Sequence, residues 1–215
     1  MMLKPGFDLI APYYDFLAGL VFGRTLKKAQ LTFLDNIPEQ ARILIIGGGS
    51  GWLLPEIFAR TSTCQIVYLE ASANMLNQAK QKIKDPAQAA CVEFRFGTEN
   101  NIQPEEEFEV VISFFFLDLF LPAELENITH ILFRHLQPGG LWLVTDFVQT
   151  HNAGLWQIWT KILTQSMYRF FRVVSGISAT TLPDWQNILA HYNLAPQKSA
   201  YFYHNLIKSV LYQKK

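Results

Sequence analysis

The stretch Ile43-Leu44-Ile45-Ile46-Gly47-Gly48-Gly49-Ser50-Gly51-Trp52 decides the fold of this chain. Its four branched apolar residues predict a short buried strand that runs directly into a glycine-rich turn. The glycines at 47, 49 and 51 permit positive φ angles and remove Cβ atoms that would keep a ligand from the backbone. The residues after the turn, through Arg60, predict a helix with Pro55 in its first turn. A strand, a glycine turn and a helix N-terminus together favour a binding edge for a nucleotide-like ligand.

The spacing of these glycines separates two classes of nucleotide-binding protein. A dinucleotide-binding turn has the pattern G-x-G-x-x-G, and its third glycine would fall at Trp52. The chain has G-x-G-x-G instead. This spacing disfavours an NAD-dependent oxidoreductase, which is the least favoured of three functional alternatives.

A carboxylate follows the next predicted strand. Gln65-Ile66-Val67-Tyr68-Leu69 ends at Glu70, roughly 20 residues after the glycines, where a ribose-binding acid is expected. The two oxygens of one carboxylate can accept both ribose hydroxyls. A lone glutamate at a strand end would be solvated, but the preceding glycine turn favours a cofactor role.

The rest of the chain alternates predicted helices and strands, which indicates an α/β fold with a doubly wound, mostly parallel sheet. We expect seven strands in a Rossmann-like arrangement, with an antiparallel strand near the C-terminus. A capping box at Thr181-x-x-Asp184 predicts a helix that runs to His191. The other predicted elements are helices at 73–84, 125–136 and 151–171, strands at 108–114 and 141–147, and a hairpin at 197–212 with its turn at His204-Asn205.

Four motifs stand in the order and spacing of a known family. They are Gly47-x-Gly49-x-Gly51, Leu69-Glu70-Ala71-Ser72-x-x-Met75-Leu76, Phe108-Glu109-Val110-Val111-Ile112-Ser113 and Leu136-x-Pro138-Gly139-Gly140. The chain resembles the class I S-adenosylmethionine-dependent methyltransferases, particularly the branch of quinone-biosynthesis and other small-molecule enzymes. The opening Phe7-Asp8-x-Ile10-Ala11-x-x-Tyr14-Asp15 also resembles that branch. The resemblance covers most of residues 7–147 and implies S-adenosylmethionine as cofactor and S-adenosylhomocysteine as product.

The resemblance implies a cofactor site at the carboxyl ends of the strands. Two positions depart from the family pattern: Ile45 stands where an acidic residue is usual, and Thr98 where an aspartate is usual. Glu99 is one position late and is a candidate to serve instead of that aspartate. The predicted cofactor-binding residues are Tyr14, Gly47, Gly49, Gly51, Glu70, Ala71, Met75, Thr98, Glu99, Ser113 and Phe114.

In methyl transfer from S-adenosylmethionine, the main tasks of the protein are to align a nucleophile with the methyl group and to exclude water. Aromatic faces suit a sulfonium, and Tyr14, Phe114 and Phe115 are the candidates. A general base is needed if the nucleophile carries a proton. The candidates are Asp118, Asp146 and His151, which lie just after predicted strands. No His, Cys or Asp cluster has metal-ligand spacing, so we expect no metal.

Composition and charge bound the remaining possibilities. A chain of 215 residues with 50% apolar content can bury the core of one domain. We divide that domain, 1–215, into a helical N-terminal lid at 1–40, a cofactor-binding core at 41–147 and a substrate side at 148–215. Lys+Arg and Asp+Glu balance at 18 each, so no overall field favours nucleic acid. Cys64 and Cys91 are expected to be reduced, which suits a cytoplasmic protein without a transmembrane segment.

The favoured function is methyl transfer to a small, apolar or aromatic metabolite. The second alternative is a catalytically inactive methyltransferase-fold binding or scaffold protein, for which Ile45 and Thr98 are the motive. Five aromatic residues gather between 151 and 175, where they would line a pocket, form a dimer or membrane-surface patch, or pack on the sheet. The sequence leaves open the acceptor, the choice among C-, N- and O-methylation, peripheral membrane contact and a homodimer. The five are Trp156, Trp159, Tyr168, Phe170 and Phe171.

Overall fold

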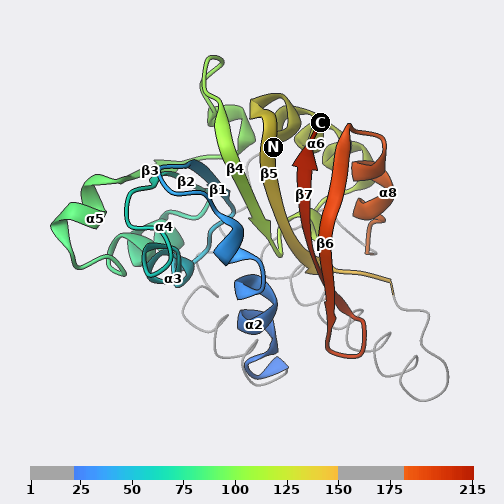
Figure 1. Ribbon diagram of the computed structural model, residues 1–215, viewed down its shortest axis with the longest axis horizontal. Coiled ribbons are helices and arrows are strands. Elements are labelled where there is room, and N and C mark those ends of the chain that lie inside the picture. Colours follow the sequence, from blue (N-terminus) through green and yellow to red (C-terminus); the bar gives the residue numbers. More distant parts are fainter. Residues whose placement is uncertain (1–21, 150–181) are drawn as a thin grey trace.

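The computed structural model describes residues 22–149 and 182–215, which form a seven-stranded sheet with helices on both faces (Figure 1). The order across the sheet is β3-β2-β1-β4-β5-β7-β6. All strands run in one direction except β7, which pairs antiparallel with both β5 and β6. This confirms the expected doubly wound sheet. The strands are β1 (Arg42–Ile46), β2 (Gln65–Glu70), β3 (Val92–Phe96), β4 (Phe108–Phe114), β5 (Leu136–Phe147), β6 (Leu194–Phe202) and β7 (Ile207–Lys214).

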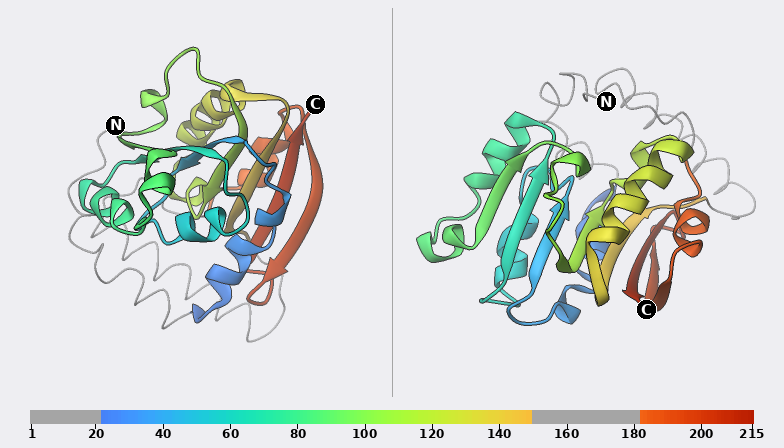
Figure 2. Two further views of the ribbon diagram at one scale, coloured as in Figure 1. Left: turned by 60° about the vertical axis from the view of Figure 1, so that its left-hand side comes forward. Right: turned by 90° about the horizontal axis from the view of Figure 1, so that it is seen from above.

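The helices of the described residues divide between the two faces of the sheet (Figure 2). α6 (Pro122–His135) and α8 (Trp185–Ala190) pack on one face. α2 (Thr25–Leu31), α3 (Leu53–Phe58) and α4 (Ala73–Lys80) pack on the other. The remaining helices are short: α5 (Pro86–Ala90) and the 3-10 helices η1 (Leu34–Asn36), η2 (Glu99–Asn101) and η3 (Leu117–Leu119).

Alternate residues of each central strand enter different cores. In β1, Leu44 and Ile46 pack toward α6, while Ile43 and Ile45 pack toward α3 and α4. Side chains alternate across a strand, and helices cover both faces, so a central strand must be apolar throughout. This explains why the first predicted strand is a continuous apolar run rather than an alternating one.

The position of the glycine turn follows from the strand order. β1 lies between β2 and β4, so the chain winds to one side of β1 first and to the other side afterwards. The carboxyl ends of β1 and β4 therefore flank the point where the winding reverses. Ligands of open parallel sheets bind at this point, and the 47–51 turn leaves β1 there.

Two predicted helices differ from the observed ones at their ends. α4 ends at Lys80 instead of Lys84, and Asp85 then begins α5 by accepting a hydrogen bond from the amide of Ala87. Pro86 disfavours helical conformation in the residue before it, so Asp85 is extended and α5 is a helix separate from α4. The N-cap of α8 is Asp184, which accepts from the amide of Asn187, and not the expected Thr181. Thr181 and the predicted helix at 151–171 lie outside the described residues.

The expected C-terminal hairpin is confirmed, with slightly longer strands. Its turn holds three consecutive residues, Tyr203, His204 and Asn205, at φ angles of 47°, 53° and 64°. Left-handed turn residues match the twist of the paired strands in a tight hairpin, and Asn tolerates the left-handed region better than most residues. In the described ranges, no helix combines the length and apolarity that crossing a membrane requires.

Candidate cofactor site

The glycines of the 47–51 turn serve different purposes. Gly47, Gly49 and Gly51 all have positive φ angles, of 63°, 65° and 79°. A Cβ at Gly47 would lie 2.5 Å from the ring of Phe116, and one at Gly51 would lie 2.5 Å from the Cα of Ala79. A Cβ at Gly49 would meet nothing within 4 Å. The turn is therefore packed against protein at both ends and open at Gly49.

Tyr68 is a support of the turn that the sequence interpretation missed. Its ring fills the space next to Gly48, where a Cβ would lie 2.3 Å from the ring carbon Cζ. Its hydroxyl donates a hydrogen bond of 2.9 Å to the carbonyl of Gly49, and the residue is fully buried. Gly48 could have indicated this support in the sequence. The cofactor pattern requires glycine only at 47, 49 and 51, so a glycine at 48 needs another reason.

Glu70 joins the turn to the helix that follows β2. Its Oε2 accepts from the amide of Gly49 at 2.9 Å, and its Oε1 accepts from the amide of Ser72 at 2.8 Å. Ser72 in turn caps α4 by accepting from the amide of Met75. Each oxygen of the Glu70 carboxylate thus accepts from a backbone amide, one in the glycine turn and one at the start of α4.

The loop after β3 lies beside Glu70 at the same edge of the sheet. Glu70 and Phe96 are register partners at the ends of β2 and β3. The amide of Thr98 donates to the side chain of Asn101, and Glu99 accepts from the side chain of Asn100. These bonds form a closed turn that places Thr98 and Glu99 close to the end of β2.

Two positions that bear on the cofactor are enclosed in the cores. The Oγ of Ser113 accepts a 2.9 Å hydrogen bond from the indole of Trp142, and Ser113 is fully buried. Ile45 is 2% exposed and packs toward α3 and α4. Ile45, which stands where the family usually has an acidic residue, is therefore an apolar side chain in an apolar core. Phe114, at the end of β4, is partly exposed and packs beside the same core.

The predicted bases fall into two groups. Asp146 is fully buried at the end of β5, and Asp118 is 4% exposed in η3. Burial, followed by the neighbouring Asp118, raises the pKa of Asp146 well above its usual range. The third candidate, His151, and the predicted aromatic contact Tyr14 lie outside the described residues.

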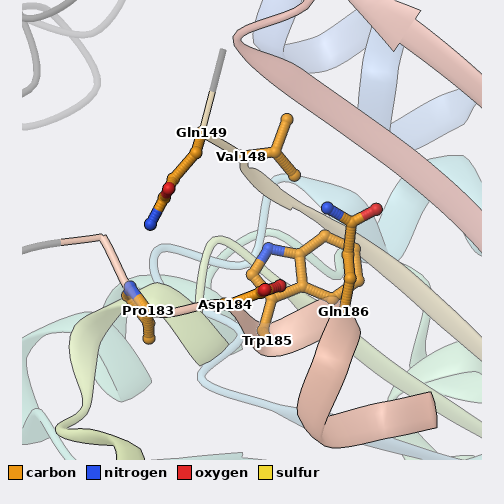
Figure 3. Close-up of a pocket in the computed structure, with 6 residues that line it drawn as sticks. All are labelled: Val148, Gln149, Pro183, Asp184, Trp185 and Gln186. Carbon is orange, nitrogen blue, oxygen red and sulfur yellow. The ribbon is translucent and has the colours of Figure 1, made fainter. Parts of the chain in front are cut away.

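A small hollow lies beside the end of β5 (Figure 3). It is lined by Val148, Gln149 and residues 183–186. The indole of Trp185 donates to the carbonyl of Phe147 at 2.8 Å, and Asp184 caps α8. The indole of Trp185 and the carboxylate of Asp184 therefore both bond to backbone groups of the protein. No predicted cofactor-binding residue lines the hollow.

The residues at the carboxyl edge fit a nucleoside cofactor. Gly49 leaves room for close approach to the backbone, Glu70 places a carboxylate beside that opening, and α4 begins three residues later. The parts are held together by hydrogen bonds and ring contacts within the protein, which fix the shape of the cradle. Such preorganisation lowers the ordering cost of binding.

Comparison with known proteins agrees with this geometry. A methyltransferase-domain model matches residues 44–142, which include the glycine turn and Glu70. The chain therefore carries a methyltransferase domain and is similar to the class I S-adenosylmethionine-dependent methyltransferases. The cofactor of this methyltransferase is accordingly S-adenosylmethionine, and the resemblance found in its motifs is confirmed.

Curated relatives are quinone-biosynthesis enzymes. The methyltransferase is 25% identical over 175 residues to a ubiquinone/menaquinone biosynthesis C-methyltransferase of Ruegeria sp. (strain TM1040), which covers 79% of this chain and 68% of the relative. It is 26% identical over 162 residues to the enzyme of that name from Methylococcus capsulatus, covering 70% of this chain and 62% of the relative. The chain therefore spans between three fifths and about two thirds of the length of these relatives.

Solved structures share the fold at low sequence identity. The mitomycin 7-O-methyltransferase MmcR has a TM-score of 0.68 at 14% identity, with 97% of this chain and 60% of that one covered. The N-methyltransferase NodS from Bradyrhizobium japonicum, solved with S-adenosylhomocysteine, has a TM-score of 0.65 at 13% identity. That match covers 90% of this methyltransferase and 88% of NodS.

Proposed function

We propose that this methyltransferase transfers the methyl group of S-adenosylmethionine to a small, apolar or aromatic metabolite. The observation that carries the proposal is the joined turn, in which Glu70 binds the amide of Gly49 at the one place where the turn is open. When bound, the cofactor supplies an electrophilic methyl carbon on a sulfonium. The protein then has to hold it, align the acceptor and exclude water.

We assign the holding role to Glu70 and the turn. The Glu70 carboxylate orients the ribose, and the open space at Gly49 admits the cofactor against the backbone. Thr98 and Glu99 stand beside Glu70 and extend the same edge toward the base. Ala71 and Met75 lie at the start of α4 and remain predicted contacts of the cofactor. The hydroxyl of Ser113 accepts from the indole of Trp142, so we assign Ser113 a structural part in β4 rather than a contact with the cofactor.

The proposed acceptor class rests on aromatic rings near the ends of β4 and β5. Phe22, Phe115, Phe147 and Tyr203 come from four separate segments and contact one another with centroid distances of 4.9–5.5 Å. Phe115 and Tyr203 are partly exposed. An apolar or aromatic acceptor suits such surroundings, and the names of the curated relatives point to quinones. The named relatives and structures include C-, O- and N-methyltransferases, so the acceptor atom is left to experiment.

Calorimetric titration with S-adenosylhomocysteine tests the cofactor site. We expect binding in the micromolar range, about −8 kcal/mol, and at least tenfold weaker binding by Gly49→Ala, because its methyl group enters the open side of the turn. Gly139→Ala is the matched control. Gly139 also has a positive φ, of 77°, and open space around its Cβ position, but it lies at the exposed start of β5.

The two variants separate a local effect from general strain. Equal loss of affinity in both would show that backbone strain, and not the cradle, determines binding. No binding by the unaltered protein would contradict the proposed function. Transfer of labelled methyl from S-adenosylmethionine to a panel of quinols, phenols and aliphatic amines then tests the acceptor class. Transfer to the amines alone would contradict an apolar or aromatic acceptor.

A further inference from the structure

Two buried aspartates meet at the carboxyl edge of the sheet. Asp146 is the penultimate residue of β5 and is fully buried, while Asp118 lies in η3 and is 4% exposed. They are separated by 28 residues in the sequence, yet the backbone amide of Asp118 donates to the Oδ2 of Asp146 at 3.3 Å. Aspartates are seldom buried this fully unless a specific set of partners compensates their desolvation.

Asp146 receives its partners from the chain that leaves β4. Its Oδ2 accepts from the amides of Phe116, Leu117 and Asp118 at 3.2, 2.9 and 3.3 Å. Its Oδ1 accepts from the amide of Phe147 at 2.8 Å. One carboxylate thus gathers three consecutive amides of residues 115–118, which we call the β4 exit segment.

The β4 exit segment supports the cofactor turn directly. The ring of Phe116 fills the space beside Gly47, where a Cβ would lie 2.5 Å from the ring. Phe115 has a φ angle of 50°, which is unfavourable for a bulky residue, and its ring packs 5.1 Å from that of Phe147. Such a backbone persists when the surrounding contacts determine it strongly, and the amide bonds to Asp146 supply those contacts.

Neighbouring carboxyl groups in a buried site disfavour each other's ionisation. Burial, and then the neighbouring Asp118, raises the pKa of Asp146 well above its usual range, and this effect outweighs the amide hydrogen bonds from Phe147 and Asp118 that lower it. The pair therefore holds a shared proton at higher pH than an exposed aspartate would. The cation opposite Asp146 in β7, Lys208, donates to Gln186, and Asp118 is the charged group that acts on Asp146.

We propose that Asp146 and Asp118 are positioning residues, which form a carboxylate–carboxylic acid pair that fixes the β4 exit segment and, through Phe116, the shape of the cofactor turn. The inference rests on the proposed function for the identity of the ligand. It assigns to these two aspartates a task other than that of a general base. The four backbone amides that donate to the Asp146 carboxylate suit this task, and both side chains are buried.

The first test is Asp146→Asn. The introduced amide offers one acceptor oxygen where Asp146 uses two, so at least one backbone amide loses its partner. We expect S-adenosylhomocysteine to bind at least tenfold more weakly. Hydrogen exchange at the amides of residues 116–118 should become faster. Asp85→Asn, which alters the exposed N-cap of α5, is the matched control and should change neither measurement.

The second test is Asp118→Asn, which supplies an N–H donor to Asp146 without a titrating proton. The folded wild-type pair holds a proton that the unfolded chain releases above about pH 4. Wild-type stability should therefore fall relative to that of Asp118→Asn as the pH rises from 5 to 8. Asp118→Ala lacks the donor, so it should bind S-adenosylhomocysteine more weakly than Asp118→Asn.

The outcomes separate this inference from the proposed function. Wild-type binding with unchanged affinity in Asp146→Asn would overturn the inference alone. So would a stability difference between Asp118→Asn and wild type that stays constant from pH 5 to 8. Absence of binding by the wild-type protein would contradict the proposed function, and with it the positioning of a cofactor turn.

Discussion

At the scale of single residues, the glycine turn shows how one motif meets several physical demands. A Cβ at Gly47, Gly48 or Gly51 would collide with neighbouring atoms, those of Phe116, Tyr68 and Ala79 respectively. Gly49 faces open space. A substitution at any of them is unfavourable, but for different reasons. Only the change at Gly49 acts on a ligand directly.

Glu70→Gln tests the carboxylate of the site. The introduced amide can accept from the amide of Gly49 or that of Ser72, but not from both as Glu70 does. Hydrogen bonds to charged groups contribute about 1.5–3 kcal/mol, so we expect roughly tenfold or greater loss of affinity for S-adenosylhomocysteine by calorimetry. Glu105→Gln, an exposed position in the loop before β4, should bind normally. Equal affinity of both variants would contradict a role for Glu70 in the site.

The sequence predicts the carboxylate and the turn, but not the residues that support them. Glu70 is recognisable because it follows a strand at a fixed distance from the glycines. Tyr68 and Phe116 are recognisable only once the register of the strands and the path after β4 are known. Their function is to fill the volumes that absent Cβ atoms leave, and no local pattern records such a volume.

At the scale of elements, α4 depends on the turn that precedes it in space. A Cβ at Gly51 would collide with the Cα and Cβ of Ala79 at 2.5 and 2.6 Å. Because the collision involves the backbone of α4, the helix would have to move. The start of α4 is fixed by two hydrogen bonds, from the amide of Ser72 to Glu70 and from the amide of Met75 to Ser72.

Gly51→Ala should therefore be less stable than Gly139→Ala. Both place alanine at a φ angle near 80°, which costs about 1–2 kcal/mol, and the collision with α4 adds a further 1–3 kcal/mol by overpacking. Urea unfolding of the two variants measures the difference. Equal midpoints and slopes would show that α4 adjusts freely and that the turn does not fix it.

Most elements could be predicted because their signals are local. The apolar run of β1, the stripe of α6 and the two strands of the hairpin follow from periodicity alone. The early end of α4 and the late start of α8 could not be predicted in this way, because the sequence offers more than one residue that could cap a helix in each region. Asp85 and Asp184 are the caps in the structure, and each begins a short helix of its own.

At the scale of the whole molecule, one carboxylate links several distant segments. Glu106 accepts from the guanidinium groups of Arg42 in β1 and Arg95 in β3, both at 2.5 Å. The carbonyl of Glu106 contacts the ring of His135 at the end of α6. The Glu106 side chain is 10% exposed. The hydrogen bond with Arg95 is the main cause that lowers the pKa of Glu106 to about 2.

This shift predicts a loss of stability in acid. The pKa of Glu106 is lower in the folded protein than the ordinary value of 4.5, so the unfolded chain takes up its proton first as the pH falls. The contribution is complete above about pH 4.5 and disappears as the pH approaches 2. It amounts to roughly 2–3 kcal/mol.

Urea unfolding of Glu106→Gln between pH 7 and 3 measures this contribution. The variant should be less stable than wild type at pH 7, and the gap should narrow as the pH falls. Glu105→Gln, whose side chain is exposed, should show a constant gap near zero. A constant gap for Glu106→Gln would contradict the linkage. The sequence could not predict this network, because residues 42, 95 and 106 become neighbours only when β1, β2 and β3 are in register.

The position of β7 inside the sheet constrains the route by which the protein folds. β6 precedes β7 in the chain but reaches β5 only through it, since β7 pairs with both. Strands added one at a time in chain order would leave β6 with no partner until β7 had formed. Hairpins close within microseconds, so we expect β6 and β7 to dock on β5 as a preformed unit. The left-handed turn at residues 203–205 would then be an early nucleus of folding.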